Sequence, residues 1–348
     1  MKRIGGIFER LSSEDNLMIA FYSAAKGKRN KNSYGKQVKE YGENLAANTA
    51  RLSRELRDGT WKPHGTRMFQ RVEHGKCRRI IWFHIFEDLV VMHAIYQCVG
   101  PYLERKLIED TYSGVKKRGV SRGIRRIRRW MAEYPDGVPV YILKADFRHY
   151  YESVSIPRLK AKLANCIKDK RVLRLYGLFL DEVHSGLPIG SFLSQLLANL
   201  YLTDIDRAAK RLGLRHYARY CDDVVAISSD RAKLKELLEV MRRMAEEEGL
   251  EIKANVQIYP IERHGLDFMG YVFHRRGFVR LRKRTERRFR RVVHVCKREE
   301  GRGNLVERVA SYKGLVQPLT HGGTFWHSVV GMEFKDFYNK YRRKHANT

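Results

Sequence analysis

Apolar residues recur every three or four positions along four stretches of the chain, and this spacing predicts helices that each bury one face. Asp58-Gly59-Thr60 ends the first stretch, because glycine beside polar residues favours a chain reversal. From about residue 284 onward the pattern predicts further helices, and these are rich in basic residues. The four predicted helical stretches are residues 14–57, 86–107, 191–211 and 231–248.

Strand-like runs lie between the predicted helices. Residues 66–72 and 79–83 flank His74-Gly75, which is typical of a β-hairpin. Residues 138–143 form a short apolar run and predict one buried strand. The order of helices, hairpins and strands implies an α+β fold, a sheet with helices on one face. Two more strand pairs are predicted, residues 216–219 with 224–227 and residues 266–273 with 278–281.

The charge of the chain narrows the function. Its 348 residues include 69 Lys and Arg against 39 Asp and Glu, a formal net charge of +30. Such a surplus indicates a polyanionic partner, and nucleic acid is the first candidate. With 43% hydrophobic residues the chain can bury a large core, which excludes global disorder. No run approaches the ~18 apolar residues of a membrane-spanning helix, and the N-terminus lacks the apolar segment of a signal peptide.

The cysteines favour a reducing compartment. They are odd in number and never spaced Cys-x-x-Cys, which argues against a disulfide framework and against a zinc knuckle. We therefore expect a cytoplasmic nucleic-acid binder with no membrane partner. The five residues are Cys77, Cys98, Cys166, Cys221 and Cys296.

Three carboxylates are candidates for catalysis. Asp146 follows a predicted buried strand, and Asp222-Asp223 occupy the tip of a predicted hairpin. A buried acid is costly unless a cation pairs with it, either Lys or Arg or a divalent metal such as Mg²⁺. Two such ions about 4 Å apart would activate a 3′-hydroxyl and stabilise the leaving pyrophosphate. The alternative is that Asp-Asp merely suits the turn.

Four motifs follow one another along the chain. Phe-Arg-His-Tyr-Tyr follows Asp146, and a longer motif, Gly-Leu-Pro-Ile-Gly-Ser-Phe-Leu-Ser-Gln-Leu-Leu-Ala-Asn-Leu-Tyr-Leu, occupies residues 186–202. Tyr-Cys-Asp-Asp then occupies residues 220–223, and Phe-Met-Gly-Tyr residues 268–271. In this order the motifs resemble the successive palm motifs of reverse transcriptases.

The resemblance extends over nearly the whole chain. Arg79-Ile80-Ile81 and Asp88…His93-Ala94 resemble fingers motifs, and Ser311-Tyr312-Lys313-Gly314 resembles a thumb helix of the bacterial enzymes. It implies a right-hand polymerase that acts as an RNA-directed DNA polymerase, a nucleotidyltransferase. The implied domains are fingers at residues 1–135, a palm with an antiparallel sheet and the catalytic acids at 136–272, and a basic helical thumb at 273–348.

One motif is similar to a particular group of reverse transcriptases. Most bacterial enzymes carry Gln-Gly-x-x-x-Ser-Pro, whereas residues 189–195 read Ile-Gly-x-x-x-Ser-Gln, as in diversity-generating retroelements. The compact length agrees, since it leaves no room for a protease, integrase, maturase or nuclease domain. That family copies a template-repeat RNA with errors opposite adenine and is assisted by a small basic accessory protein. Two alternatives stay open: another bacterial retroelement or phage-defence reverse transcriptase, and a non-catalytic RNA-binding scaffold.

The resemblance assigns roles to individual residues. Asp146, Asp222 and Asp223 would bind two Mg²⁺ (or Mn²⁺) ions, with the Phe147 carbonyl as a further ligand. Tyr151 falls at the position of the sugar gate that excludes a ribose 2′-OH; the alternative is an ordinary core tyrosine.

Further roles concern the substrates. Arg79 matches the arginine that binds the dNTP triphosphate, unless it is one more surface arginine. The primer grip would comprise Phe268, Met269, Gly270 and Tyr271.

Two positions depart from the family pattern. Val115 stands where relatives commonly have Arg, and either Lys116 or Arg118 would replace it in dNTP binding. Val256 stands where many relatives have a Lys that protonates pyrophosphate. Lys253 is near but out of register, so no general acid is assigned.

The second palm motif carries a fidelity hypothesis. Ile189 has no side-chain donor or acceptor, so it would lose about 1 kcal/mol of discrimination, roughly fivefold, relative to Gln. The alternative is simple core filling. Gly190, Ser194 and Gln195 belong to the same predicted template and fidelity motif.

Two nearly single-signed basic runs predict surfaces that follow the phosphates of template and duplex. One comprises arginines beside Trp130, and the other lies within residues 275–302. The residues expected to contact nucleic acid are Arg125, Arg129, Arg284, Arg288 and Lys313.

Overall fold

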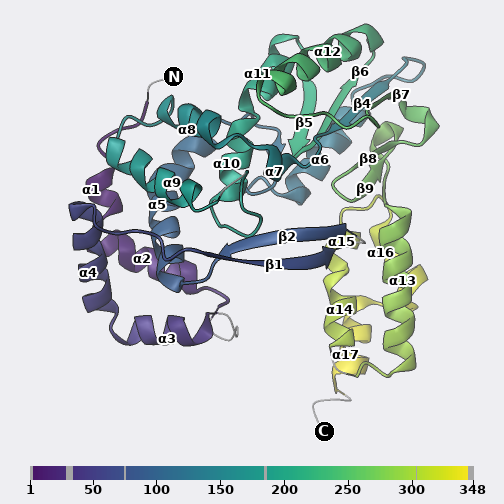
Figure 1. Ribbon diagram of the computed structural model, residues 1–348. Coiled ribbons are helices and arrows are strands. Elements are labelled where there is room, and N and C mark those ends of the chain that lie inside the picture. The colour runs from purple at the N-terminus through teal and green to yellow at the C-terminus, as the bar shows by residue number, and fades with distance from the viewer. Residues whose placement is uncertain (1–2, 29–33, 74–75, 184–185, 303, 344–348) are drawn as a thin grey trace. The chain divides into compact units, whose positions relative to one another are not determined.

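The computed structural model describes residues 3–28, 34–73, 76–183, 186–302 and 304–343 (Figure 1). The chain forms two compact units. The first unit comprises Met1–Val115, Ala145–Gly213 and Glu236–Val256. The second unit comprises Lys116–Lys144, Leu214–Lys235 and Gln257–Thr348. Because each unit is assembled from three separate segments, neither corresponds to one continuous stretch of sequence.

The first unit is mainly helical. Its centre is α5 (Phe86–Glu104), which is buried on most of its surface because apolar residues occur all round it. Helix α2 (Glu14–Ala25) packs on α5 and on α4 (Leu45–Asp58). The other helices of this unit are α1 (Phe8–Leu11), α3 (Gly35–Glu43), α7 (Tyr150–Ser153), α8 (Ile156–Ala164), α9 (Lys170–Asp181), α10 (Ser194–Tyr201), α11 (Thr203–Arg211) and most of α12 (Arg231–Glu247).

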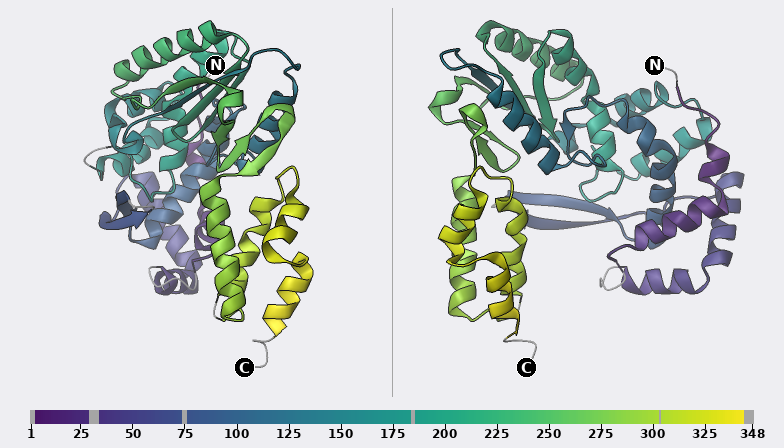
Figure 2. Two further views of the ribbon diagram at one scale, coloured as in Figure 1. Left: turned by 90° about the vertical axis from the view of Figure 1, so that its right-hand side faces the viewer. Right: turned by 180° about the vertical axis from the view of Figure 1, so that it is seen from behind.

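The first unit also contains a two-stranded ribbon, visible in both views of Figure 2. Strands β1 (Thr66–Glu73) and β2 (Lys76–Phe83) pair antiparallel, from Thr66 opposite Phe83 to Glu73 opposite Lys76. This confirms the predicted hairpin, whose turn at His74-Gly75 lies outside the described residues. The short β3 (Thr111–Tyr112) follows α5.

The second unit contains the main sheet, in which β5, β6, β4 and β7 are neighbours in that order. Strands β5 (His216–Tyr220) and β6 (Asp223–Ser228) form the predicted antiparallel hairpin. Strand β4 (Tyr141–Asp146) pairs antiparallel with β7 (Gln257–Pro260). Helix α6 (Val120–Ala132) covers part of this sheet, since its Trp130 stacks on His216 at a centroid distance of 5.1 Å.

The second unit continues with a three-stranded sheet and a group of helices. The sheet has the order β10 (Val279–Leu281), β9 (Tyr271–Phe273), β8 (Leu266–Phe268). The main helix, α13 (Lys283–Arg298), contacts α14 (Leu305–Ser311) and α16 (Gly322–Val330), and the helices lie side by side in Figures 1 and 2. The remaining elements are η1 (Ile261–Arg263), η2 (Arg275–Gly277), α15 (Lys313–Val316) and α17 (Phe334–Arg343).

Four predicted stretches differ in detail from the structure. The strand expected at 138–143 begins at Tyr141, because Pro139 has no N–H to donate to a ladder. The stretch 14–57 is largely helical as predicted and contains three helices, and the stretch 191–211 contains two helices on either side of Leu202. The arm expected at 266–273 is itself a hairpin, β8–β9.

The turn between β8 and β9 explains the last difference. Phe268 pairs with Tyr271, so Met269 and Gly270 form a two-residue turn, with φ of 52° and 92°. Turns with two positive φ values match the twist of antiparallel strands. Methionine rarely adopts this conformation, so the sequence pattern did not predict a turn here.

No helix in the described ranges is long and apolar enough to cross a membrane.

Candidate functional site

Asp222 and Asp223 lie at the tip of the β5–β6 hairpin. Tyr220 pairs with Asp223, so Cys221 and Asp222 form the turn. The flanking strands are buried, whereas residues 220–223 are half-buried. The hairpin therefore presents two adjacent carboxylates on a buried support.

Arg219 holds this turn from within the protein. Its side chain is 1% exposed, and Nη1 donates a hydrogen bond of 2.8 Å to the Cys221 carbonyl. Cys221 has φ of 56°, a left-handed conformation that costs free energy for a residue with a Cβ. The hydrogen bond offsets part of that cost, so Arg219 fixes the turn that carries the acids. Sequence reasoning missed Arg219; the signal is a lone arginine inside an otherwise buried strand.

Asp146 is the last residue of β4. This strand is the neighbour of β6 in the sheet. Its Oδ2 pairs with Lys253 Nζ, and the Lys253 N–H donates to the Asp146 carbonyl at 2.9 Å. Its Oδ1 is buried without a hydrogen-bond partner among the described residues. One oxygen thus already has a cation, and the other is placed to accept one.

The backbone beside Asp146 offers a further oxygen. Phe147 and Ile252 form an isolated antiparallel bridge. Its two hydrogen bonds run from Arg148 N–H to the Glu251 carbonyl and from Lys253 N–H to the Asp146 carbonyl. Neither bond uses the Phe147 carbonyl.

Carboxylate and carbonyl oxygens are the ligands that Mg²⁺ prefers. The buried Oδ1 of Asp146, without a donor in the described part of the chain, fits a cation at this position. The described residues contain no group of three His, Cys, Asp or Glu side chains close enough to hold a metal ion. Asp146 belongs to the first unit, whereas Asp222 and Asp223 belong to the second.

The motif after Asp146 packs against the start of the next motif. Leu187 N–H donates to the Tyr151 carbonyl at 2.6 Å. Gly186 has φ of +66°, and a Cβ there would lie 2.3 Å from the same carbonyl oxygen. Tyr151 is half-buried and packs edge-on against the buried Tyr150, with ring centroids 5.7 Å apart. The two motifs are therefore in contact within the first unit.

Ile189 and Gly190 lie against β2. The Ile81 N–H donates to the Ile189 carbonyl at 3.0 Å. Gly190 has φ of +116°, and a Cβ there would lie 3.0 Å from the Ile81 carbonyl oxygen. The side chain of Ile189 is half-buried. This segment thus joins the second palm motif to the ribbon that contains Arg79, whose side chain lies outside the described residues.

Phe192, in the same segment, packs on a half-buried histidine. Its ring stacks on His93 at 3.9 Å, and burial lowers the pKa of His93 to about 4. The imidazole is therefore neutral at physiological pH.

The rest of the second palm motif enters α10. Ser194 begins this helix and is buried. Gln195 donates a hydrogen bond to Ser113 Oγ. Further along the chain from Ser113, Lys116 is exposed and Arg118 is half-buried.

The four residues predicted as a primer grip form the β8–β9 turn. Phe268 and Tyr271 are buried, and the Tyr271 hydroxyl donates to the Leu315 carbonyl at 3.0 Å. Gly270 accepts a hydrogen bond of 3.3 Å from Arg282 N–H. The turn is thereby attached to the helices that follow it.

The predicted phosphate contacts lie on exposed helix faces. Arg125 and Arg129 are exposed on α6, whose opposite face buries Ile127. Arg284 and Arg288 are exposed on α13. Lys313 is also exposed, and its Nζ lies 4.0 Å from the centroid of the Phe334 ring.

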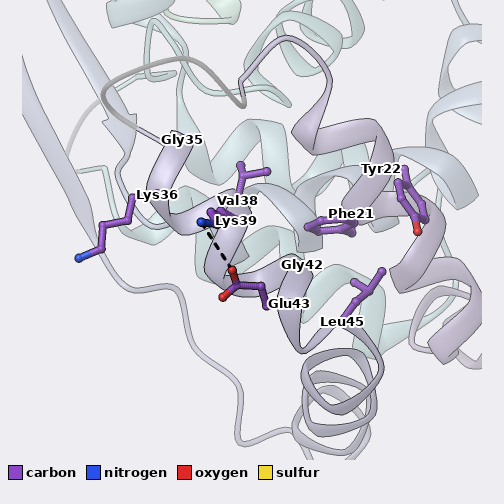
Figure 3. Close-up of a pocket in the computed structure, with 9 residues that line it drawn as sticks. All are labelled: Phe21, Tyr22, Gly35, Lys36, Val38, Lys39, Gly42, Glu43 and Leu45. Atoms are coloured by element: carbon purple, nitrogen blue, oxygen red, sulfur yellow. Dashed lines mark ion pairs between the residues drawn. The ribbon is translucent and has the colours of Figure 1, made fainter.

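A hollow of about 790 Å³ lies elsewhere in the first unit, among α2, α3 and α4 (Figure 3). Its wall includes the apolar side chains of Phe21, Val38 and Leu45. The one carboxylate in the lining, Glu43, faces Lys39 at 3.9 Å. The hollow contains none of the residues that the sequence motifs single out.

Comparisons with known proteins identify the central part of the chain. Residues 104–273 match the model of the family described as reverse transcriptase (RNA-dependent DNA polymerase). This segment contains Asp146, Asp222 and Asp223, the three acids that the sequence motifs single out.

A curated protein is similar to part of this chain. The group II intron-encoded protein LtrA of Lactococcus lactis subsp. cremoris is 24% identical over 177 residues. The match covers 47% of this chain and 28% of LtrA, so it spans less than a third of that relative's length.

Solved structures show the fold. Apo telomerase from Candida tropicalis is similar with a TM-score of 0.52 and 13% identity, over 79% of this chain and 61% of that one. The telomerase of the same organism in complex with a fragment of telomeric RNA gives a TM-score of 0.51 and 11% identity, over 87% and 59%. The expected right-hand polymerase fold, with a sheet backed by helices, is confirmed.

Proposed function

We propose that this protein is an RNA-directed DNA polymerase that extends a cDNA 3′ end with dNTPs on an RNA template. The observation that carries the proposal is the β5–β6 hairpin, which presents Asp222 and Asp223 from a buried support inside the reverse transcriptase domain. Strand β4, which ends in Asp146, is the neighbour of β6 in the same sheet. Asp146 ends β4, Asp223 begins β6 and Asp222 lies in the turn before it, and carboxylates of this kind are what metal-assisted phosphoryl transfer needs.

The proposed metal ligands are Asp146, Asp222, Asp223 and the Phe147 carbonyl. Two bound Mg²⁺ or Mn²⁺ ions would supply an activated 3′-hydroxyl and stabilise the leaving pyrophosphate. The chain itself contributes the orientation of the acids. Arg219 holds the turn before Asp222. Lys253 pairs with Oδ2 of Asp146, while Oδ1 has no hydrogen-bond partner among the described residues.

Other residues would bind and select the nucleotide. Arg79 would hold the triphosphate, because a guanidinium forms two parallel hydrogen bonds to phosphate oxygens. Lys116 or Arg118 would supply a second cation. The half-buried ring of Tyr151 would exclude a ribose 2′-OH and so favour dNTPs.

The nucleic acid would be held by the basic helix faces and the primer by the β8–β9 turn, Phe268 to Tyr271. Arg125 and Arg129 on α6 and Arg284 and Arg288 on α13 are exposed, and their contacts to phosphates would give affinity without sequence choice. Template selection would then need RNA structure or a partner. The proposed partners are template RNA, its cDNA duplex and a small basic accessory protein.

The finer proposal is a role in a diversity-generating retroelement, which makes error-prone cDNA from a template-repeat RNA. It is supported by the Ile189-Gly190…Ser194-Gln195 motif. Another bacterial retroelement reverse transcriptase is the second candidate, and the similarity to a group II intron-encoded protein favours it.

The test is primer extension on a defined RNA template with Mg²⁺ and all four dNTPs, followed by sequencing of the cDNA. Extension that Asp222→Asn abolishes while RNA binding persists would support the enzyme. Errors clustered opposite adenine would support the mutagenic role, and accurate cDNA would favour the second candidate. No synthesis by the unchanged chain, with RNA binding intact even after a basic accessory protein is added, would favour a scaffold.

A further inference from the structure

A short strained turn precedes the segment that contains Lys116 and Arg118. Ser113 has φ of 86° and Gly114 has φ of +65°, so two successive residues adopt left-handed conformations. Glycine adopts such angles at little cost, but serine does so at a cost of free energy. The turn therefore needs support from outside its own backbone.

Helix α10 supplies that support. Asn199 Nδ2 donates a hydrogen bond of 2.8 Å to the Ser113 carbonyl, and Gln195 Nε2 donates to Ser113 Oγ. Gln195 and Asn199 are four residues apart and so lie on one face of the helix. Asn199 is 1% exposed. Both side chains thus donate a hydrogen bond to Ser113, the strained residue of the turn.

Gly114 completes the contact. A Cβ at this position would lie 2.3 Å from Gln195 Cγ, which is far inside van der Waals contact. The Gln195 side chain therefore packs directly on the backbone of the turn, and only glycine leaves room for it.

We infer that Gln195 and Asn199 are positioning residues: they hold the Ser113-Gly114 turn and so fix the start of the segment from which Lys116 and Arg118 meet the incoming dNTP. The inference rests on the proposed polymerase activity. It also changes the expected role of Gln195 from a template contact to a support for the fingers. A turn that is already ordered loses less entropy when the nucleotide binds, so the support acts on dNTP affinity.

The directions of the two hydrogen bonds make a sharp test. A serine hydroxyl can donate as well as accept, so Gln195→Glu keeps a hydrogen bond to Ser113 with the direction reversed. A backbone carbonyl only accepts, so Asn199→Asp places two acceptors against each other. Both variants change the side chain equally little in shape and add the same charge. Gln195→Ala removes the contact, and Asn165→Asp adds the same charge at an exposed position as a control.

The first readout is amide hydrogen exchange over residues 111–119 in the full chain, which does not depend on polymerase activity. We expect exchange to rise roughly tenfold in Asn199→Asp and in Gln195→Ala, as for a lost buried hydrogen bond, and to stay within about twofold in Gln195→Glu and Asn165→Asp. Equal behaviour of Gln195→Glu and Asn199→Asp would overturn the inference.

The second readout is primer extension with varied dNTP. We expect Asn199→Asp and Gln195→Ala to raise the KM for dNTP roughly tenfold and to leave kcat within about twofold of the unchanged chain. Gln195→Glu should keep the KM of the unchanged chain. A loss in kcat alone, or a KM that changes with the template sequence, would overturn the positioning role. If the unchanged chain makes no cDNA, the proposed function fails, whereas the exchange result still decides whether α10 holds the turn.

Discussion

Two hairpins of this protein differ in how much of their surface is covered. The β5–β6 hairpin is buried along both strands, and Arg219 holds its turn. The β1–β2 ribbon exposes Met68, Phe69 and Val72, the last at 73%. It is anchored near its base, where Phe83 is buried and Ile81 N–H bonds to Ile189.

In the proposed polymerase, this difference would separate two tasks. An isolated two-stranded hairpin is only marginally stable, whereas a hairpin inside a sheet is as stable as its core. Acids that must keep a fixed geometry therefore lie on the buried hairpin. The ribbon, which contains Arg79, opens and moves at lower cost and suits a part that closes on a substrate.

The largest effect is expected at the turn of the buried hairpin. Arg219→Leu removes the hydrogen bond to the Cys221 carbonyl and leaves buried polar groups unpaired, so the free energy of unfolding should fall by about 3 kcal/mol. Urea denaturation followed by circular dichroism measures this change. Arg215→Leu, at an exposed position just before β5, is the control, and equal effects of the two variants would refute the assignment.

The anchor of the exposed ribbon should respond next. Gly190→Ala adds strain at φ of +116° and a close contact with the Ile81 carbonyl, a cost of about 1–3 kcal/mol. Gly213→Ala also places an alanine at a positive φ (+74°) but with no atom within 4 Å, so it is the control for an alanine that adds no close contact. Faster amide exchange at Ile81 in Gly190→Ala, and not in Gly213→Ala, would confirm the anchor; the same rate in both would reject it.

Lys253→Met tests whether Lys253 and Mg²⁺ compete for the carboxylate of Asp146. The pair is about one-third exposed, so stability should change by less than about 1 kcal/mol. Removing the cation leaves Asp146 more available to Mg²⁺, and we expect the Mg²⁺ concentration for half-maximal primer extension to fall severalfold. Lys235→Met, at an exposed position of α12, should leave it unchanged. An unaltered or higher Mg²⁺ requirement in Lys253→Met would contradict the competition.

The smallest effect is expected on the ribbon surface. Val72→Thr should change the free energy of unfolding by less than about 0.5 kcal/mol, because the side chain is exposed. Val225→Thr, the same change at a fully buried position of β6, should cost about 1–3 kcal/mol, since it buries a hydroxyl. Similar denaturation midpoints for the two variants would remove the distinction between the hairpins.

The hairpin that presents Asp222 and Asp223 was predictable because apolar runs flank a short polar tip, and this pattern reports burial directly. The same reasoning placed the β4 strand three residues early, since Val138 and Pro139 are apolar but the proline cannot join a ladder. The pattern of apolar and polar residues indicates which positions are buried, but it does not take into account that a proline lacks the N–H that a strand needs.

The contacts of the site were less predictable. Lys253 reaches Asp146 across a bridge between Phe147 and Ile252, residues that are far apart in the chain. Gln195 was recognised as part of a motif. Its contact with Ser113, however, depends on a left-handed turn that no local sequence pattern predicts. Pairings across long sequence separations depend on the tertiary fold, which spacing along the chain does not contain.

The interleaving of the two units has a consequence for synthesis on the ribosome. The chain passes from one unit to the other five times. The last segment of the first unit, Glu236–Val256, emerges after two segments of the second unit and before the largest segment of that unit, Gln257–Thr348. Neither unit can form all its contacts before its own last segment has been made. Apolar surfaces of each unit therefore stay uncovered until that segment has been synthesised. Fragments cut at any single position would likewise divide a unit, so an active enzyme should be recovered from two co-expressed fragments only when they reassemble.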